Sequence, residues 1–337
     1  MLRIGIIGFG GNGHHHFKGL SQMGEFAKVV AIADKREEKR ADIPEGIHAY
    51  EDGVDLLKNE ELDVVYISVP TYLHTKFAVM AMEKGCDVFL EKPVCMCEEE
   101  AELLLETQKK TGAKVQVGVV CRFDAPWVFT KNLIDSGKYG KVISGEFYRQ
   151  ARSCEWSWNN WYDDPDMCGT VALDLHIHNV DTIRWYMGGD PDSFDVEVIR
   201  DEEGVIQHIY TTYLYGDAVI RAVDTWALHD TFGFHEPYLV HFEKATVEFD
   251  GRKLITIYEE DGEKRTVELV SEVEMKADEN DETNLDSLDG FYTEDKFFLT
   301  QIIPGKAEEK ASLADAIKST LHAHKEIAKA GGRKLKK

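Results

Sequence analysis

Long apolar runs and basic residues are both scarce in this sequence. No apolar run reaches the roughly 18 residues that a membrane-spanning helix needs, and the first residues lack the charged and apolar regions of a signal peptide. We therefore expect a cytoplasmic protein. Only 39 Lys and Arg stand against 62 Asp and Glu, a formal net charge of −23. Such an acidic chain repels nucleic-acid phosphates and anionic membranes, so neither is an expected partner.

Cysteine is also limited, to six residues that all lie in the first half of the chain: Cys86, Cys95, Cys97, Cys121, Cys154 and Cys168. A chain of 337 residues does not need disulfides to stabilise its core, so reduced thiols are expected. The sequence has no HExxH motif and no paired CxxC motifs, which are typical of zinc sites. It also lacks internal repeats and low-complexity tracts. No metal is predicted.

Apolar runs and helical patterns alternate along the first part of the chain. Five apolar runs are typical of buried strands, and they span residues 2–9, 26–34, 62–70, 86–93 and 113–120. Helical patterns at 74–85 and 98–112 lie between them. This alternation predicts βαβ units and a doubly wound parallel sheet of the Rossmann type. We predict an α/β protein whose first domain covers residues 1–121.

The pattern changes after Arg122. A helix is predicted at 127–140 and a strand at 141–152, and alternating apolar and polar runs extend from Asp195 to Val270. Gly216 and Asp217 separate two of these runs as a hairpin turn would. We predict a second domain, residues 122–337, of the α+β class, with a largely antiparallel, open-faced sheet and helices on one face.

A glycine-rich loop follows the first predicted strand. In the stretch GFGGNG, Gly8, Gly10 and Gly13 match the pattern G-x-G-x-x-G, and a helical pattern begins at once. Glycine at these positions allows a tight turn and a close approach to a pyrophosphate, which the N–H groups of the helix start can bind. Gly11 and Asn12 complete the loop. The sequence therefore predicts a dinucleotide site.

Charged residues near this loop bear on the choice of cofactor. Asp34 follows the second predicted strand, about 20 residues after Gly13, where a carboxylate binds the ribose 2′-hydroxyl of NAD. Lys35 and Arg36 come directly afterwards and could accept the 2′-phosphate of NADP, so we favour NAD and leave NADP open. Residues His14 to His16 point in different directions on a helix and cannot converge on one ion, so they are expected to be surface and packing residues.

Two further stretches carry ionisable side chains. Lys92, in Glu91-Lys92-Pro93, ends the fourth predicted strand, and ligands bind at the carboxyl ends of such strands. In DLHIHNVD, residues 174–181, apolar residues at helical spacing predict one continuous helix through Met187. Asp174 and His178 would share a face, with Asp181 as a structural partner and His176 pointing away. This helix offers too few ligands for zinc, which leaves a proton-transfer pair or an interior His–Asp pair.

Together these motifs resemble the Gfo/Idh/MocA family of glucose–fructose oxidoreductase and inositol dehydrogenase. The resemblance rests on the glycine loop, on PTYLH at 70–74, on AMEKGCDVFLEKP at 81–93, on the helix of Asp174 and His178, and on the closing pattern DAIKSTLHAHKEIAKAGG. It implies a catalytic group of Lys92, Asp174 and His178, and a second domain that binds the substrate and forms a homodimer or homotetramer. It also implies further cofactor contacts at Pro70, Thr71, His74, Glu91 and Lys92.

Two residues depart from the pattern of that family. The chain has His176 where the family often has glycine, and Thr71 where asparagine is common. Because these positions border the substrate or nicotinamide in the family, the departures bear on the identity of the substrate.

We therefore expect an NAD(P)-dependent dehydrogenase that transfers hydride between nicotinamide and a secondary hydroxyl of a sugar, inositol or related polyol. His178 would be the general base, Asp174 would orient it, and Lys92 would stabilise the alkoxide. The expected substrate contacts are Tyr72, Arg122, Trp156, Trp158 and His235. Two alternatives stay open: a glycoside-cleaving enzyme that oxidises a sugar transiently, and a non-catalytic dinucleotide-binding sensor.

Overall fold

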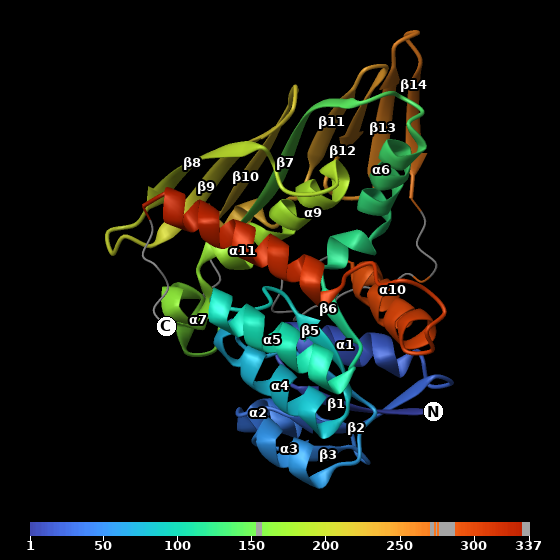
Figure 1. Ribbon diagram of the computed structural model, residues 1–337, viewed down its shortest axis with the longest axis vertical. Helices are drawn as coiled ribbons and strands as arrows, with labels where there is room; N and C mark the ends of the chain where they lie inside the picture. Colours follow the sequence, from blue (N-terminus) through green and yellow to red (C-terminus); the bar gives the residue numbers. More distant parts are fainter. Residues whose placement is uncertain (153–156, 270–272, 274, 276–286, 332–337) are drawn as a thin grey trace. The chain divides into compact units, whose positions relative to one another are not determined.

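The computed structural model describes residues 1–152, 157–269, 273, 275 and 287–331, and its contacts form two compact units (Figure 1). The first unit combines Met1–Val120 with Val273–Lys318, and the second combines Cys121–Glu272 with Ser319–Lys337. Residues 273–318, which we expected in the second domain, thus belong to the first unit. The reason is apolar packing, because Phe298 and Ile302 share one buried core with Ile4 on the first strand.

The first unit contains a parallel sheet of six strands in the order β3-β2-β1-β4-β5-β6. Its strands are β1 (Leu2–Ile7), β2 (Ala27–Ala33), β3 (His48–Tyr50), β4 (Val64–Ile67), β5 (Asp87–Glu91) and β6 (Val115–Gly118). Its helices are α1 (Gly11–Ser21), α2 (Glu37–Ala41), α3 (Gly53–Asn59), α4 (His74–Lys84), α5 (Glu98–Thr111) and α10 (Asp289–Phe297). The predicted doubly wound sheet is confirmed. Among the six strands of this sheet, β3 alone was not predicted, because its three residues are largely exposed and need no apolar run.

The second unit contains a sheet of eight strands in the order β14-β13-β12-β11-β7-β10-β9-β8. Its strands are β7 (Val142–Arg152), β8 (Ser193–Arg200), β9 (Ile206–Tyr215), β10 (Ala218–Leu228), β11 (Tyr238–Phe242), β12 (Ala245–Phe249), β13 (Leu254–Glu259) and β14 (Lys264–Glu268). All neighbours are antiparallel except β7 and β10. The predicted hairpin at Gly216 joins β9 to β10, with Tyr215 paired to Ala218.

Helices cover one face of this second sheet (Figure 1). They are α6 (Ala125–Ser136), α8 (Val171–Asp174), α9 (Ile177–Met187) and the part of α11 (Leu313–Lys329) that belongs to this unit. Side chains along β10 alternate between buried and exposed over its first half, as expected where one face meets the helices. The fold class predicted for the second domain is confirmed.

Two further findings concern the whole of the described chain. None of the described cysteines, Cys86, Cys95, Cys97, Cys121 and Cys168, forms a disulfide. Among the residues that the structure describes, no helix has the length and apolar character needed to cross a membrane.

Candidate active site

Close backbone contacts require glycine at two positions of the loop after β1. Gly8 has a φ of +95°, and a Cβ there would lie 2.3 Å from the carbonyl oxygen of Ser68. A Cβ on Gly13 would lie 2.0 Å from the Gly8 carbonyl oxygen. Helix α1 begins at Gly11, and its N-cap residue, Gly10, has no side chain that could bond to the first N–H groups. The N–H groups of its first turn have no partner within the helix, so the loop has the form that a bound pyrophosphate requires.

The Asp34 carboxylate, directly after β2, is held by hydrogen bonds. It accepts one from the Phe9 N–H at 2.8 Å, and others from Arg36 through its backbone N (2.9 Å), Nε (3.0 Å) and Nη2 (3.1 Å). Burial opposes ionisation, but these hydrogen bonds and the Arg36 charge lower the pKa of Asp34. Lys35 is exposed and pairs with Asp52 at 3.3 Å. Sequence reasoning treated Arg36 only as a phosphate ligand and missed this pairing.

His74 anchors the chain that follows Lys92. Its Nδ1 lies 2.7 Å from the carbonyl oxygen of Pro93, and its Nε2 lies 2.8 Å from that of Val69. Both ring nitrogens are therefore occupied by the backbone, and the ring is 1% exposed. His74, which we expected to contact the cofactor, thus holds two loops together beside Lys92. Thr71, another expected contact, is also buried, at 1% exposure.

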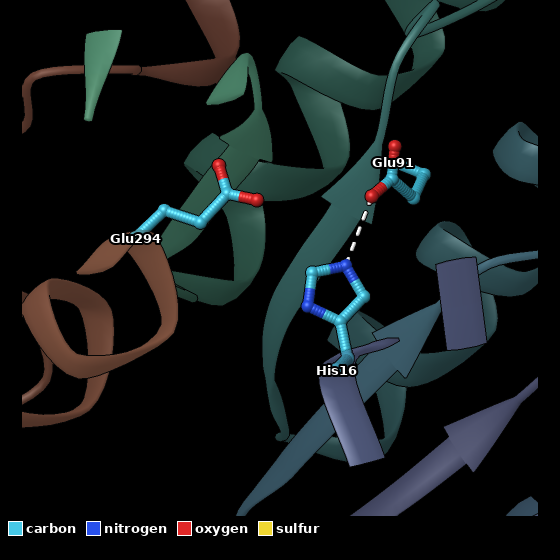
Figure 2. Close-up of side chains that lie close together, drawn as sticks. All are labelled: His16, Glu91 and Glu294. Carbon is cyan, nitrogen blue, oxygen red and sulfur yellow. Dashed lines mark hydrogen bonds and ion pairs between the residues drawn. The ribbon is translucent and has the colours of Figure 1, made fainter. Parts of the chain in front are cut away.

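A buried ion cluster adjoins Lys92. Glu91, the last residue of β5, meets His16 with 2.9 Å between Oε1 and Nε2 (Figure 2). The Nδ1 of the same ring lies 2.9 Å from Oδ1 of Asp295 on α10. Burial opposes a charge on His16, but Asp295 and Glu91 raise its pKa well above the usual value. We expected a surface or packing residue, whereas His16 joins the helix of the glycine loop to the strand end that carries Lys92.

Glu294 lies near this cluster, and one atom each of His16, Glu91 and Glu294 lies within 4.8 Å of the others (Figure 2). This set of residue types resembles three metal ligands. A metal-bound imidazole, however, must present a deprotonated nitrogen, and both nitrogens of His16 face carboxylates that a doubly protonated ring satisfies. We therefore interpret the cluster as a buried imidazolium between carboxylates, and we assign no metal to it.

Asp174 and His178 lie on either side of a helix break in the second unit. The sequence predicted a continuous helix, but α8 ends at Asp174 and α9 begins at Ile177. The His176 N–H bonds to the carbonyl oxygen of Val171, five residues back, at 2.9 Å, and the His178 N–H bonds to that of Leu175 at 3.3 Å. The predicted continuous helix is therefore interrupted between Asp174 and His178. Asp174 is 8% exposed, and His178 is partly buried.

Arg122 does not have the position expected of a substrate contact. It is 3% exposed and binds Asp181 through two hydrogen bonds, Nε to Oδ2 at 2.8 Å and Nη2 to Oδ1 at 2.7 Å. Ser319 donates a further hydrogen bond to Asp181 at 2.7 Å. Asp181 is thus the structural partner that the sequence suggested, and Arg122 anchors α9 instead of binding substrate.

The other expected contacts lie at or near the protein surface. Tyr72 and Trp158 are 37% and 40% exposed and are accessible to a ligand. His235 is partly buried, and its ring packs against Phe232 with 4.7 Å between centroids. Pro70 is partly buried at the end of the loop after β4. Trp156 lies outside the described residues.

Known sequences match both units. A family model described as an oxidoreductase family with an NAD-binding Rossmann fold matches residues 2–119, and one described as the GFO/IDH/MocA C-terminal domain matches residues 127–248. The scyllo-inositol 2-dehydrogenase (NAD(+)) of Bacillus subtilis is 29% identical over 192 residues, and the inositol 2-dehydrogenase of Salmonella typhimurium is 29% identical over 197. Each alignment covers 56% of this chain and 55% of the relative, so the chain spans about half the length of the curated relatives it matches.

Solved structures share the fold across the chain. An oxidoreductase from Agrobacterium radiobacter in complex with NAD+, L-tartaric acid and magnesium has a TM-score of 0.84 at 16% identity, covering 98% of this chain and 96% of that one. A levoglucosan dehydrogenase in complex with NADH and levoglucosan has a TM-score of 0.82 at 19% identity, covering 98% and 97%. With family models matching the greater part of both units, the chain belongs to the GFO/IDH/MocA family of oxidoreductases.

Proposed function

We propose that this chain is an NAD-dependent dehydrogenase that transfers hydride between nicotinamide and a secondary hydroxyl of an inositol, a sugar or a related polyol. The observation that carries the proposal is the cradle at Gly8 and Gly13, where a Cβ would meet backbone oxygen at 2.3 Å and 2.0 Å. Only glycine permits these close backbone contacts, which keep the turn tight and the start of α1 close to the end of β1. Gly11 and Asn12 lie on the first turn of that helix, where N–H groups can bind a pyrophosphate. The names of the inositol dehydrogenase relatives support the substrate class.

Asp34 supports NAD over NADP. Its lowered pKa keeps it ionised at neutral pH, and a carboxylate accepts hydrogen bonds from ribose hydroxyls but repels a 2′-phosphate. The positive charge of Arg36 is already paired with Asp34, so it attracts the 2′-phosphate of NADP less strongly.

Oxidation of a secondary alcohol removes a hydride from carbon and a proton from oxygen. Bound NAD would supply the hydride acceptor. We assign His178 as the base that takes the hydroxyl proton, because a neutral imidazole accepts protons near neutral pH. Asp174 would orient this imidazole or bind a neighbouring hydroxyl. The Lys92 ammonium would stabilise negative charge on the substrate oxygen as the proton leaves, and the product is a ketone.

We also propose a homodimer or homotetramer formed through the face of the second sheet that no helix of the described residues covers. Leu214 and Val219 are paired neighbours on β9 and β10, 39% and 38% exposed, and Tyr210 on the same face is 37% exposed. Exposed apolar patches of this kind mark interfaces. Light scattering on Leu214→Asp should show dissociation, whereas a wild-type monomer at every concentration would contradict the assignment.

The dehydrogenase proposal is tested by nicotinamide absorbance during turnover. Wild-type protein would be assayed with NAD or NADP across inositols, aldoses and alkyl glycosides. Lys92→Ala should lower kcat by about 10²–10³, whereas Lys76→Ala, which removes an exposed lysine on α4, should leave it unchanged.

The outcome also separates the alternatives. Cofactor binding without turnover of any member of the panel would contradict the proposal and favour a sensor. Cleavage of a glycoside without net reduction of NAD would identify transient oxidation.

A further inference from the structure

His176 lies within the break between α8 and α9, and its surroundings are unlike those of an ordinary helical residue. Its φ of −63° and ψ of −27° are helical, yet its N–H bonds to the carbonyl oxygen of Val171, five residues back. The next turn is tighter, because the His178 N–H bonds to the carbonyl oxygen of Leu175, three residues back. Local widening of this kind needs stabilisation from outside the helix and often occurs at functional sites.

That stabilisation comes from two buried carboxylates. The Nδ1 of His176 makes a hydrogen bond with Asp224 on β10, and the Nε2 lies 2.7 Å from Glu326 Oε2 on α11. His176 and Glu326 are 0% exposed and Asp224 is 1% exposed. Because two acceptors face the two nitrogens, only the doubly protonated ring can donate to both.

The carboxylates are themselves fixed from several elements. Asn179, on α9, donates to Asp224 Oδ1 at 2.6 Å. Thr211 and Tyr213, on β9, donate to Glu326 at 2.6 Å and 2.9 Å. The network thus ties the helix break to β9, β10 and α11 of the same unit.

The electrostatics agree with this geometry. Burial opposes a charge on His176, but Glu326 and Asp224 raise its pKa to about 10. The ring is therefore cationic at neutral pH, and it cannot contact a substrate because it is fully buried with both nitrogens occupied. His176 stands where the family often has glycine, a difference that we associated with the identity of the substrate. Its contacts lie instead in the buried interior of the second unit.

We propose that His176 is a positioning residue, whose ion triad with Asp224 and Glu326 holds the helix break and thereby sets where Asp174 and His178 stand. This inference rests on the proposed function of those two residues. A displacement of about 1 Å at a catalytic group costs on the order of 10² in rate, so loss of the triad should act on kcat.

The test compares two variants of the full chain with a matched control. His176→Gly removes the triad, and His176→Gln keeps a hydrogen bond to one side. The control is Thr130→Val, which removes a buried hydrogen bond to Tyr238 in the same unit, 2.8 Å long and outside the triad. We expect kcat to fall about 100-fold in His176→Gly and less in His176→Gln, with KM for NAD unchanged. A fall no larger than that of Thr130→Val would overturn the proposal.

A second readout does not depend on turnover or on the folding of the glycine variant. The ring resonances of His178, followed by NMR in the unliganded protein, should shift in His176→Gln and stay in place in Thr130→Val. Unmoved resonances would overturn the positioning role even if the protein is no dehydrogenase. If instead the resonances shift while wild-type protein turns over no substrate, the positioning role is supported and the proposed function fails.

Discussion

Replacement of Gly13 by alanine is the sharpest test of the cofactor loop. A Cβ at this position would lie 2.0 Å from the Gly8 carbonyl oxygen. Non-bonded carbon and oxygen need more than 3 Å, so the loop or the helix must move by about 1 Å. The clashing atom belongs to the backbone, and no side-chain rotation relieves the contact.

The size of the effect follows from this displacement. Overpacking of a tight site costs about 1–3 kcal/mol, and we expect the free energy of unfolding of Gly13→Ala to fall by that amount. A shifted loop also loses hydrogen bonds to the pyrophosphate, and loss of about 1.4 kcal/mol raises Kd tenfold. We therefore expect the Kd for NAD to rise at least about tenfold.

Gly24→Ala is the matched control, because a Cβ there has nothing within 4 Å and the φ of Gly24 is ordinary. Alanine at such a position stabilises by about 0.4–1 kcal/mol or is neutral. Urea unfolding and calorimetric titration with NAD would be measured for both variants. If Gly13→Ala binds NAD as tightly as Gly24→Ala and is equally stable, the cradle is not where the cofactor binds.

The other predictions concern buried and paired charges. His16→Gln should lower the free energy of unfolding near pH 6 by about 3–5 kcal/mol, because it leaves two buried carboxylates without their cation. Because the pKa of His16 is raised, its contribution to the free energy of unfolding is complete below the unfolded pKa of about 6.5. That contribution is lost as pH rises through the folded pKa. A difference in stability from wild type that grows with pH would contradict this. Asp34→Asn should release Arg36 and raise the ratio of NADP to NAD affinity at least about tenfold, and an unchanged ratio in fluorescence titrations would refute it. Arg122→Lys should cost about 3 kcal/mol in urea unfolding, whereas Arg3→Lys, at a side chain that is 49% exposed and pairs with Glu60 at 3.6 Å, should cost under about 1 kcal/mol.

Local patterns in the sequence were sufficient to predict the parallel sheet and the glycine loop. A strand segment buried on both faces must be apolar, as in β4 and the last four residues of β1. The loop at Gly8 and Gly13 is equally local, because its turn involves neighbouring residues. Where the local signal was weak, prediction failed: β3 is short and exposed, and Phe298 joins the first core from a distant part of the chain.

The sequence by itself therefore determined the fold class of both units, the cofactor loop and the residue types available for chemistry. Tertiary structure decided which ionisable groups meet. His16 finds Asp295 across 279 residues and His176 finds Glu326 across 150, separations that no local pattern encodes. Because a buried charge must be paired to be stable, these distant partners made two apparently ordinary histidines into cations. The helix predicted through Asp174 and His178 is interrupted beside one of them, His176.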